Sequence, residues 1–395
     1  MLFPSGQGRQ NAGEMVMKPV DPTSIWTDFC AKLQRAGAIL TDLEAPTDAI
    51  TAAEGLRYLT RLTRAALESI VESSDVDAPR LFQLSNETIK IGGDNPDNIY
   101  FNATIQGDRT YRISGTRGSV PYLSFGTKAN GFSVDGGMIS TGELEDAAMQ
   151  FEADGSFEII VSTEPYAGNW LPMTAASSLL LVRQTFLRRD VERPATVKLS
   201  RVSERPHFVS LDPAELSAKL TASARFVNVT ARTFANWATM FKAYPNTFHI
   251  WDQSIFQKVG GDPNIHYLHA FWEIAPDEAW VIETDVPECR FWNFVLQNWW
   301  MESGDYRRAP DRRRKCRAWR ESRPRRCWTN SIPSWSATCA WRVRAHHIWL
   351  PVVGVGSSTS AASPRALQAR SPDRPATWRW RRLPRTLPTN SGPKA

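Results

Sequence analysis

Residues 99–115 have the sequence IYFNATIQGDRTYRISG, and this stretch decides the fold class. Two runs rich in β-branched and aromatic residues, 99–105 and 111–115, flank a polar segment that contains Gln106, Gly107 and Asp108. Such an arrangement is typical of a strand, a turn and a second strand. The sequence therefore predicts a β-hairpin here.

Similar short runs continue along the chain, separated by turn residues such as Asp154-Gly155. These further strand candidates span residues 120–126, 155–162, 178–186 and 196–202. Many short strands at regular spacing are typical of a β-sandwich or a jelly roll. We therefore expect a first β-sandwich unit over residues 79–205.

Two segments outside this unit have the apolar period of a helix. Residues 47–72 and 212–243 each carry apolar side chains at steps of three and four, and a further helix begins near Asp21. The sequence predicts an N-terminal helical segment over 21–78 and a helical insert over 206–245, both packed on the β units. Residues 1–20 show no periodicity and are expected to be disordered.

A short motif occurs twice. Gly92-Gly93-Asp94 is followed by Asn98-Ile99-Tyr100, and Gly260-Gly261-Asp262 is followed by Asn264-Ile265-His266. The repetition predicts two related β units, with equivalent strands near 98–105 and 264–274. The second unit, residues 246–306, would be incomplete. The expected fold class is thus mainly β with helices (α+β), with two sandwich-like or jelly-roll-like units.

The charge of the chain is concentrated at its C-terminal end. Residues 303–395 hold 21 Lys and Arg against 4 Asp and Glu, so their net charge is +17. The whole chain has a net charge of +6, so residues 1–302 are acidic, with a net charge of −11. They contain no Phe and only ten Leu, Ile and Val, too few for a core. We expect residues 307–395 to form a disordered basic tail, apart from a short helix around 339–343.

Two origins of this tail remain open. Its richness in Arg, Pro, Ser, Trp and Cys is typical of a GC-rich gene translated out of frame. The alternative is a nucleic-acid-binding arm, since segments such as Arg379-Trp380-Arg381 combine guanidinium groups with indole rings. Nucleic acid is the less favoured partner.

Several segments resemble a bacterial family known as domain of unknown function 1214. They are 95–102 (NPDNIYFN), 154–156 (DGS), 169–172 (NWLP), 181–186 (LVRQTF), 271–279 (FWEIAPDEA) and 299–303 (WWMES). The resemblance covers about residues 20–306 and implies β-sandwich or jelly-roll units. It implies no activity and no catalytic residues.

Candidate ligand-binding residues come from the repeated motif and from polar or aromatic positions in strands. Asp and Asn near a turn either bond to the local backbone or bind a ligand. Arg183, in the middle of an apolar strand, is an edge charge, the buried partner of a carboxylate or, less favoured, a clamp for a substrate carboxylate. The candidates are Asp94, Asn98, Tyr100, Asn102, Arg183, His266 and Trp299. Catalytic residues are unknown.

The sequence excludes several kinds of site. His266 and His269 are three residues apart in a segment with strand character, so they would point to opposite faces, and no metal is expected. No phosphate-binding glycine loop or nucleophile motif occurs, so no cofactor is expected. No run of 18 apolar residues occurs, and the five cysteines form no disulfide framework, which favours a cytoplasmic protein.

Two function classes therefore lead. The first is binding or processing of a small apolar or carbohydrate-like ligand in a concave β face. The second is a metal-independent hydrolase-type enzyme. The oligomeric state is unknown.

Overall fold

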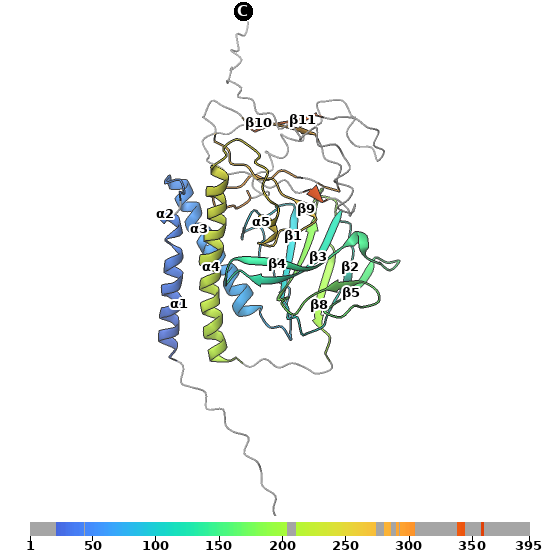
Figure 1. Cartoon of the computed structure of the whole chain (residues 1–395). Coiled ribbons are helices and arrows are strands. Elements are labelled where there is room, and N and C mark those ends of the chain that lie inside the picture. Colours follow the sequence, from blue (N-terminus) through green and yellow to red (C-terminus); the bar gives the residue numbers. More distant parts are fainter. Residues whose placement is uncertain are drawn as a thin grey trace, which may run out of the picture.

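The computed structural model describes residues 21–42, 44–203, 211–273, 280–285, 290–291, 293–304, 338–343 and 357–358. The expectations for residues 1–20, and for most of 307–395, lie outside these ranges. Figure 1 shows the described part as a β-sandwich with a layer of long helices along one side.

The helices confirm the two long helical predictions. The segment predicted at 47–72 is helix α3 followed by a π-helical turn, and the insert predicted at 212–243 is one helix, α4. The helical elements are α1 (Pro22–Ala36), α2 (Ile39–Asp42), α3 (Ala49–Ala66), η1 (Leu67–Glu72), η2 (Asp146–Ala148), α4 (Pro213–Lys242) and α5 (Ser254–Gln257).

Helices α1 and α4 begin in the same way. Asp21 and Asp212 are the N-caps, and each carboxylate accepts a backbone N–H bond two residues later. A proline follows each cap at the first helical position, where its missing N–H costs nothing. Both starts are therefore fixed by local sequence.

Eight strands form the sandwich. Their order is β1-β7-β3-β4 in the first sheet and β6-β5-β2-β8 in the second, and all neighbours are antiparallel except β5 and β6. They are β1 (Asn98–Thr104), β2 (Tyr111–Thr116), β3 (Tyr122–Gly131), β4 (Gly137–Glu145), β5 (Ser156–Ser162), β6 (Trp170–Pro172), β7 (Leu179–Thr185) and β8 (Thr196–Arg201).

The predicted hairpin over 99–115 is wrong in one respect. Both strands exist, but β1 lies in the first sheet and β2 in the second, so the connection crosses between sheets. Ala103, Ile105, Tyr111 and Ile113 all face the core between the sheets, which explains why the chain arches rather than turning back. The Tyr111 hydroxyl stabilises the arch by accepting the Gln106 N–H at 2.9 Å.

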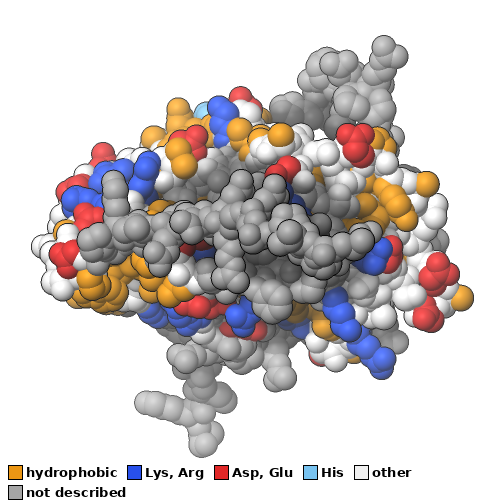
Figure 2. All heavy atoms as spheres, turned by 90° about the horizontal axis from the view of Figure 1, so that it is seen from below, with side chains coloured by type: hydrophobic (Ala, Val, Ile, Leu, Met, Phe, Trp, Pro, Cys, Tyr) orange, Lys and Arg blue, Asp and Glu red, His pale blue; other side chains and the backbone are white. Residues whose placement is uncertain are grey.

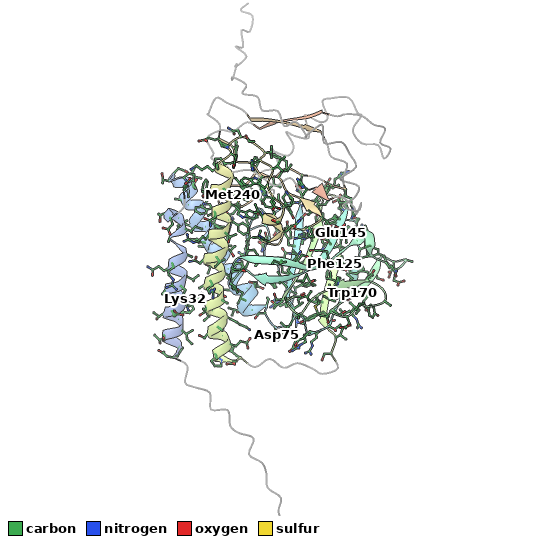
Figure 3. The ribbon with its side chains drawn as sticks, in the orientation of Figure 1. Lys32, Asp75, Phe125, Glu145, Trp170 and Met240 are labelled. Carbon is green, nitrogen blue, oxygen red and sulfur yellow. The ribbon has the colours of Figure 1, made fainter. Side chains whose placement is uncertain are left out.

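A second core joins the helices to the first sheet. It contains side chains of α3 and α4, such as Leu62 and Phe234, together with Leu179 from β7 and Trp300 from the C-terminal segment. Helix α4 packs against both α1 and α3. Figure 3 shows the side chains filling both layers, with Phe125 among the sandwich strands.

The C-terminal segment covers the first sheet without a second sandwich in its described residues. The strand expected at 264–274 is short, since β9 spans only Ile265–His266. It pairs with β12 (Ser357–Ser358), and β10 (Trp280–Asp285) pairs with β11 (Thr338–Val343). The helix expected around 339–343 is therefore wrong, because these residues form a strand.

The two copies of the motif share part of their local geometry. The first glycine of each has a positive φ angle, 62° at Gly92 and 97° at Gly260, which favours glycine, whereas at the second glycine only Gly93 does, at 77°. Asp94 and Asp262, which follow them, are both buried. The repeat is thus a repeated turn that delivers a buried aspartate.

The surface seen in Figure 2 carries both signs of charge. On the described part of this face, Lys and Arg side chains alternate with Asp and Glu, and no single-sign patch gathers there. Nucleic-acid binding needs such a basic patch. The nucleic-acid-binding arm predicted in residues 307–395 lies mostly outside the described residues, so that alternative stays a prediction.

Candidate functional site

The outer face of the first sheet is polar. The register places Tyr100, Arg183, Ser124 and Glu145 side by side, one from each of strands β1, β7, β3 and β4. Their chain neighbours point the other way, into the core between the sheets. The sheet therefore carries an apolar face on one side and a row of polar groups on the other.

Arg183 is the centre of this row. It is 6% exposed, and its guanidinium donates to the Asp262 carboxylate at 2.8 Å and to the Gly260 carbonyl at 2.7 Å. Burial disfavours the charge, but the Asp262 carboxylate nevertheless raises the pKa of Arg183. The expected carboxylate partner is thus the aspartate of the second motif, and it occupies the guanidinium.

Glu145 extends the row toward the C-terminal segment. Its carboxylate accepts the Tyr122 hydroxyl at 3.0 Å and the Asn264 side chain at 2.8 Å. Figure 3 shows Glu145 at the end of the sandwich next to β9. These bonds fix the C-terminal segment on the sheet, so this part of the face is structural.

A pocket lies at the free edge of the same sheet, beside β1. It is partly open to solvent, and its empty space is about 330 Å³ when the open side is included. Its wall is rich in amide side chains, which are Gln83, Asn86, Asn95 and Asn98. Three of the sequence candidates, Asp94, Asn98 and Tyr100, line it together.

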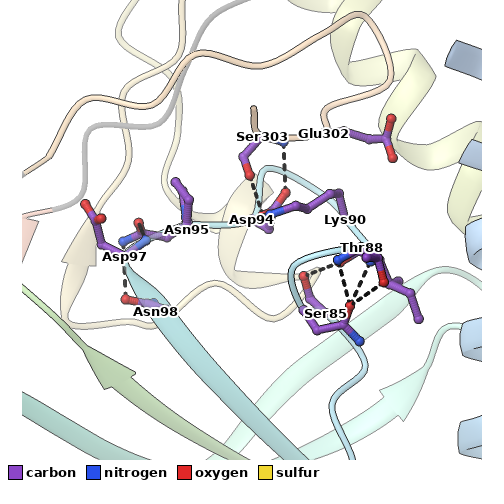
Figure 4. A network of polar contacts seen from close by, with 12 residues as sticks. Ser85, Thr88, Lys90, Asp94, Asn95, Asp97, Asn98, Glu302 and Ser303 are labelled. Atoms are coloured by element: carbon purple, nitrogen blue, oxygen red, sulfur yellow. Dashed lines mark hydrogen bonds and ion pairs between the residues drawn. The ribbon is translucent and has the colours of Figure 1, made fainter. Parts of the chain in front are cut away.

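One wall is a buried ion pair between Lys90 and the aspartate of the first motif. The Lys90 amine lies 3.2 Å from the Asp94 carboxylate, and both side chains are 4% exposed. Ser303 closes the pair from the C-terminal segment, with its N–H and hydroxyl donating to Asp94 at 3.0 and 2.6 Å. Figure 4 shows Ser303 and Lys90 meeting at Asp94.

The opposite wall is a network of asparagines. Asn98 donates to the Tyr100 hydroxyl oxygen at 3.0 Å, and Asn95 donates to Asn98 at 3.3 Å. Arg189 lies behind them and donates to the carbonyls of Pro96 and Asn98 at 2.9 and 3.0 Å. The wall is therefore held rigid before any ligand arrives.

The remaining candidates lie elsewhere. Asn102 is buried, and its side chain accepts the Leu84 N–H at 3.3 Å, which positions the loop that carries Gln83 and Lys90. His266 has an exposed side chain at β9. Trp299 is buried in the helical core against Phe271, not in a concave β face.

His269, the second histidine of the pair, lies in an aromatic environment. It is buried, stacks on Phe241 at 4.8 Å and also contacts Trp237 and Phe256. As expected, His266 and His269 therefore occupy different environments. Among the described residues, no group of three or more His, Cys, Asp or Glu side chains is arranged to hold a metal ion.

The burial of His269 predicts acid sensitivity. Burial lowers its pKa to about 3, from an ordinary value of 6.5, so the unfolded chain binds a proton in a range where the folded chain does not. Stability is therefore lost as the pH falls from 6.5 toward 3, with a slope of up to about 1.4 kcal/mol per pH unit from this group. Urea denaturation at several pH values measures it.

The variant His269→Phe tests the assignment. Phenylalanine keeps the stacking on Phe241 and cannot be protonated, so the variant should lose this part of the pH dependence. An unchanged slope between pH 6 and 4 in His269→Phe would contradict the prediction.

Sequence reasoning missed several residues of the pocket. Lys90 and Arg189 are ordinary charged positions in the sequence, and Gln83 and Asn86 belong to a loop without periodicity. The signal was partial: the asparagine-rich stretch 95–102 pointed to one wall only. The other wall comes from a loop brought alongside by the Phe82–Asn102 bridge.

The fold and the pocket define a two-sheet β-sandwich protein with a helical layer on one side and an amide-lined pocket at the edge strand. A solved structure of an uncharacterized protein from Burkholderia cenocepacia matches it with a TM-score of 0.78 and 38% identity. The match covers 91% of this chain and 96% of that chain. The chain belongs to the family of this Burkholderia protein.

Other comparisons add less. The VPA0106 protein from Vibrio parahaemolyticus matches at 8% identity with a TM-score of 0.32, over 62% of this chain and 78% of that chain, and supports no statement on the fold. No family model and no curated protein matches. The resemblance to domain of unknown function 1214 therefore stays a prediction.

The Burkholderia match also bears on the basic tail. Residues 1–306 make up about 77% of the chain, which is less than the 91% covered, so the match extends beyond residue 306. The comparison thus gives no support to an out-of-frame origin, which stays a prediction.

Within the described residues, no helix is both long and apolar enough to cross a membrane.

Proposed function

We propose that the protein binds a small, neutral, polyhydroxylated molecule of the carbohydrate class in the amide-lined pocket. The supporting observation is the chemistry of the wall, where four amide side chains stand beside only two aliphatic residues, Pro96 and Ile99. Amides both donate and accept hydrogen bonds, which matches the hydroxyl groups of a sugar. An apolar ligand would leave unused the hydrogen-bonding capacity that these amides have beyond their bonds within the wall.

The charges of the pocket favour a neutral ligand. Lys90 and Arg189 are balanced by Asp94 and Glu87, so the charged part of the wall sums to zero. Lys90 is paired with Asp94, and Arg189 is engaged by two backbone carbonyls. A ligand carboxylate or phosphate would have to compete for these cations.

The pocket is partly open to solvent, so the groups of its wall can be reached from outside. The hydrolase-type alternative and nucleic-acid binding through the tail stay predictions, since most of the tail lies outside the described residues.

Matched probes test the proposal. Saturation-transfer NMR with myo-inositol and cyclohexanol compares the same ring with many hydroxyl groups and with one, and D-glucose and D-glucuronate differ by a carboxylate. We expect transfer to myo-inositol or D-glucose and much less to the other two. Stronger binding of cyclohexanol or D-glucuronate would contradict the proposal.

A variant pair places the binding in the pocket. Gln83→Leu removes an amide from the wall, and Gln150→Leu makes the same change at an exposed position outside it. We expect Gln83→Leu to weaken probe binding about tenfold, since one lost hydrogen bond with an unpaired polar partner costs about 1–3 kcal/mol. Gln150→Leu should bind like the parent protein.

A further inference from the structure

The hydrogen bonds around Tyr100 fix which atoms donate. The backbone N–H of Asp97 donates to Oδ1 of Asn95 at 2.9 Å, so this atom must be the oxygen of the amide. The other end of the Asn95 amide, Nδ2, therefore donates to Asn98, whose receiving atom must be Oδ1. The remaining atom of Asn98, Nδ2, then donates to the Tyr100 oxygen at 3.0 Å.

A second donor reaches the same oxygen. The backbone N–H of Asn95 donates to the Tyr100 hydroxyl at 3.2 Å. The phenol oxygen thus accepts two hydrogen bonds, which uses its acceptor capacity. Its own hydrogen is used in neither bond, and the Tyr100 hydroxyl donates no hydrogen bond to any of the described residues.

Tyr111 provides the contrast within the same chain. Its hydroxyl also accepts a backbone N–H from the residue five positions earlier, that of Gln106, at 2.9 Å. Its own hydrogen, however, is donated to the Val76 carbonyl at 3.0 Å. Tyr111 is therefore satisfied inside the protein, whereas Tyr100 lines the pocket with a hydrogen left to donate.

We propose that Tyr100 is the hydrogen-bond donor that recognises an acceptor oxygen of the ligand, a hydroxyl or ring oxygen of a neutral sugar-like ring. The assignment rests on the proposed function. Asn95 and Asn98 act as positioning residues, since by donating to the phenol oxygen they direct its hydrogen away from the wall. The wall thus offers a fixed donor, which a ligand oxygen can meet without displacing a protein bond.

Two measurements test the role of Tyr100, and the first of them does not depend on the choice of ligand. Neutron diffraction of the unliganded, deuterium-exchanged protein should show the Tyr100 deuterium directed into the pocket, with Asn95 and Asn98 donating to the oxygen. A deuterium directed at a protein acceptor overturns the assignment. This result does not depend on any sugar binding.

The second measurement uses binding. Tyr100→Phe should weaken binding of myo-inositol or D-glucose about tenfold or more, while Tyr111→Phe, a matched loss of a hydroxyl in the other sheet, should leave it unchanged. Equal affinity of Tyr100→Phe and the parent protein overturns the inference and leaves the proposed function standing. If the parent binds neither probe while the deuterium points into the pocket, the proposed function fails and the donor assignment stands.

Discussion

Arg183→Leu is expected to lower the free energy of unfolding by about 3–5 kcal/mol, because it leaves Asp262 as a buried charge without its partner. Asp262 is 1% exposed, so water cannot replace the lost guanidinium. The Gly260 carbonyl loses its donor at the same time. Urea denaturation followed by tryptophan fluorescence measures the difference.

Two controls separate burial from charge. Arg112→Leu breaks the Arg112–Glu158 pair at 3.2 Å, in which both side chains are about half exposed, and should cost less than about 1 kcal/mol. The double variant Arg183→Leu/Asp262→Leu removes both buried charges and should recover much of the loss. A double variant as unstable as Arg183→Leu would show that shape, not the uncompensated charge, decides the cost.

Trp300→Ala is expected to cost about 3–5 kcal/mol, since it opens a large cavity in the helical core. Trp300 is 1% exposed, stacks with Tyr58 at 6.2 Å and donates its indole N–H to the Thr51 carbonyl at 2.9 Å. Gly55 of α3 lies against its ring, where a side chain would collide. The indole therefore anchors residues 297–303 to α3.

The comparison variants distinguish packing from the hydrogen bond. Trp300→Phe keeps part of the volume but loses the N–H donor. It should lower the free energy of unfolding, but by less than Trp300→Ala does. Trp26→Ala changes a tryptophan that is 61% exposed and should be close to neutral. Thermal unfolding of all three measures the order, and a neutral Trp300→Ala would contradict the anchoring role.

Much of the sandwich could be predicted because its inner strands are dense in apolar residues. Strand β7, which is buried along its whole length, stood out as a continuous apolar run. Strand β4 was missed, since it is an edge strand with one buried residue and with Glu143 and Glu145 on its polar side. Local pattern also could not show that β1 and β2 belong to different sheets.

The candidate site was predictable only in part, for a related reason. Asp94, Asn98 and Tyr100 lie close in sequence, so their shared motif revealed them. Of the alternatives open for Arg183, the structure shows the buried carboxylate partner, but this partner lies 79 residues away and no local pattern could name it. Trp299 was predicted as a ligand-binding residue, but it lies in the helical core. The sequence alone could not distinguish a buried aromatic residue from one that lines a binding surface.

The polar outer face of the first sheet also matters while the chain is being synthesised. The sandwich strands are complete once residue 201 has emerged, but Asp262 follows 61 residues later, which takes about 3–12 s at typical translation rates. During this interval the nascent sandwich presents hydroxyl, guanidinium and carboxylate groups to water rather than an apolar face. We therefore expect the same row that later anchors the C-terminal segment to limit premature association of the ribosome-bound intermediate.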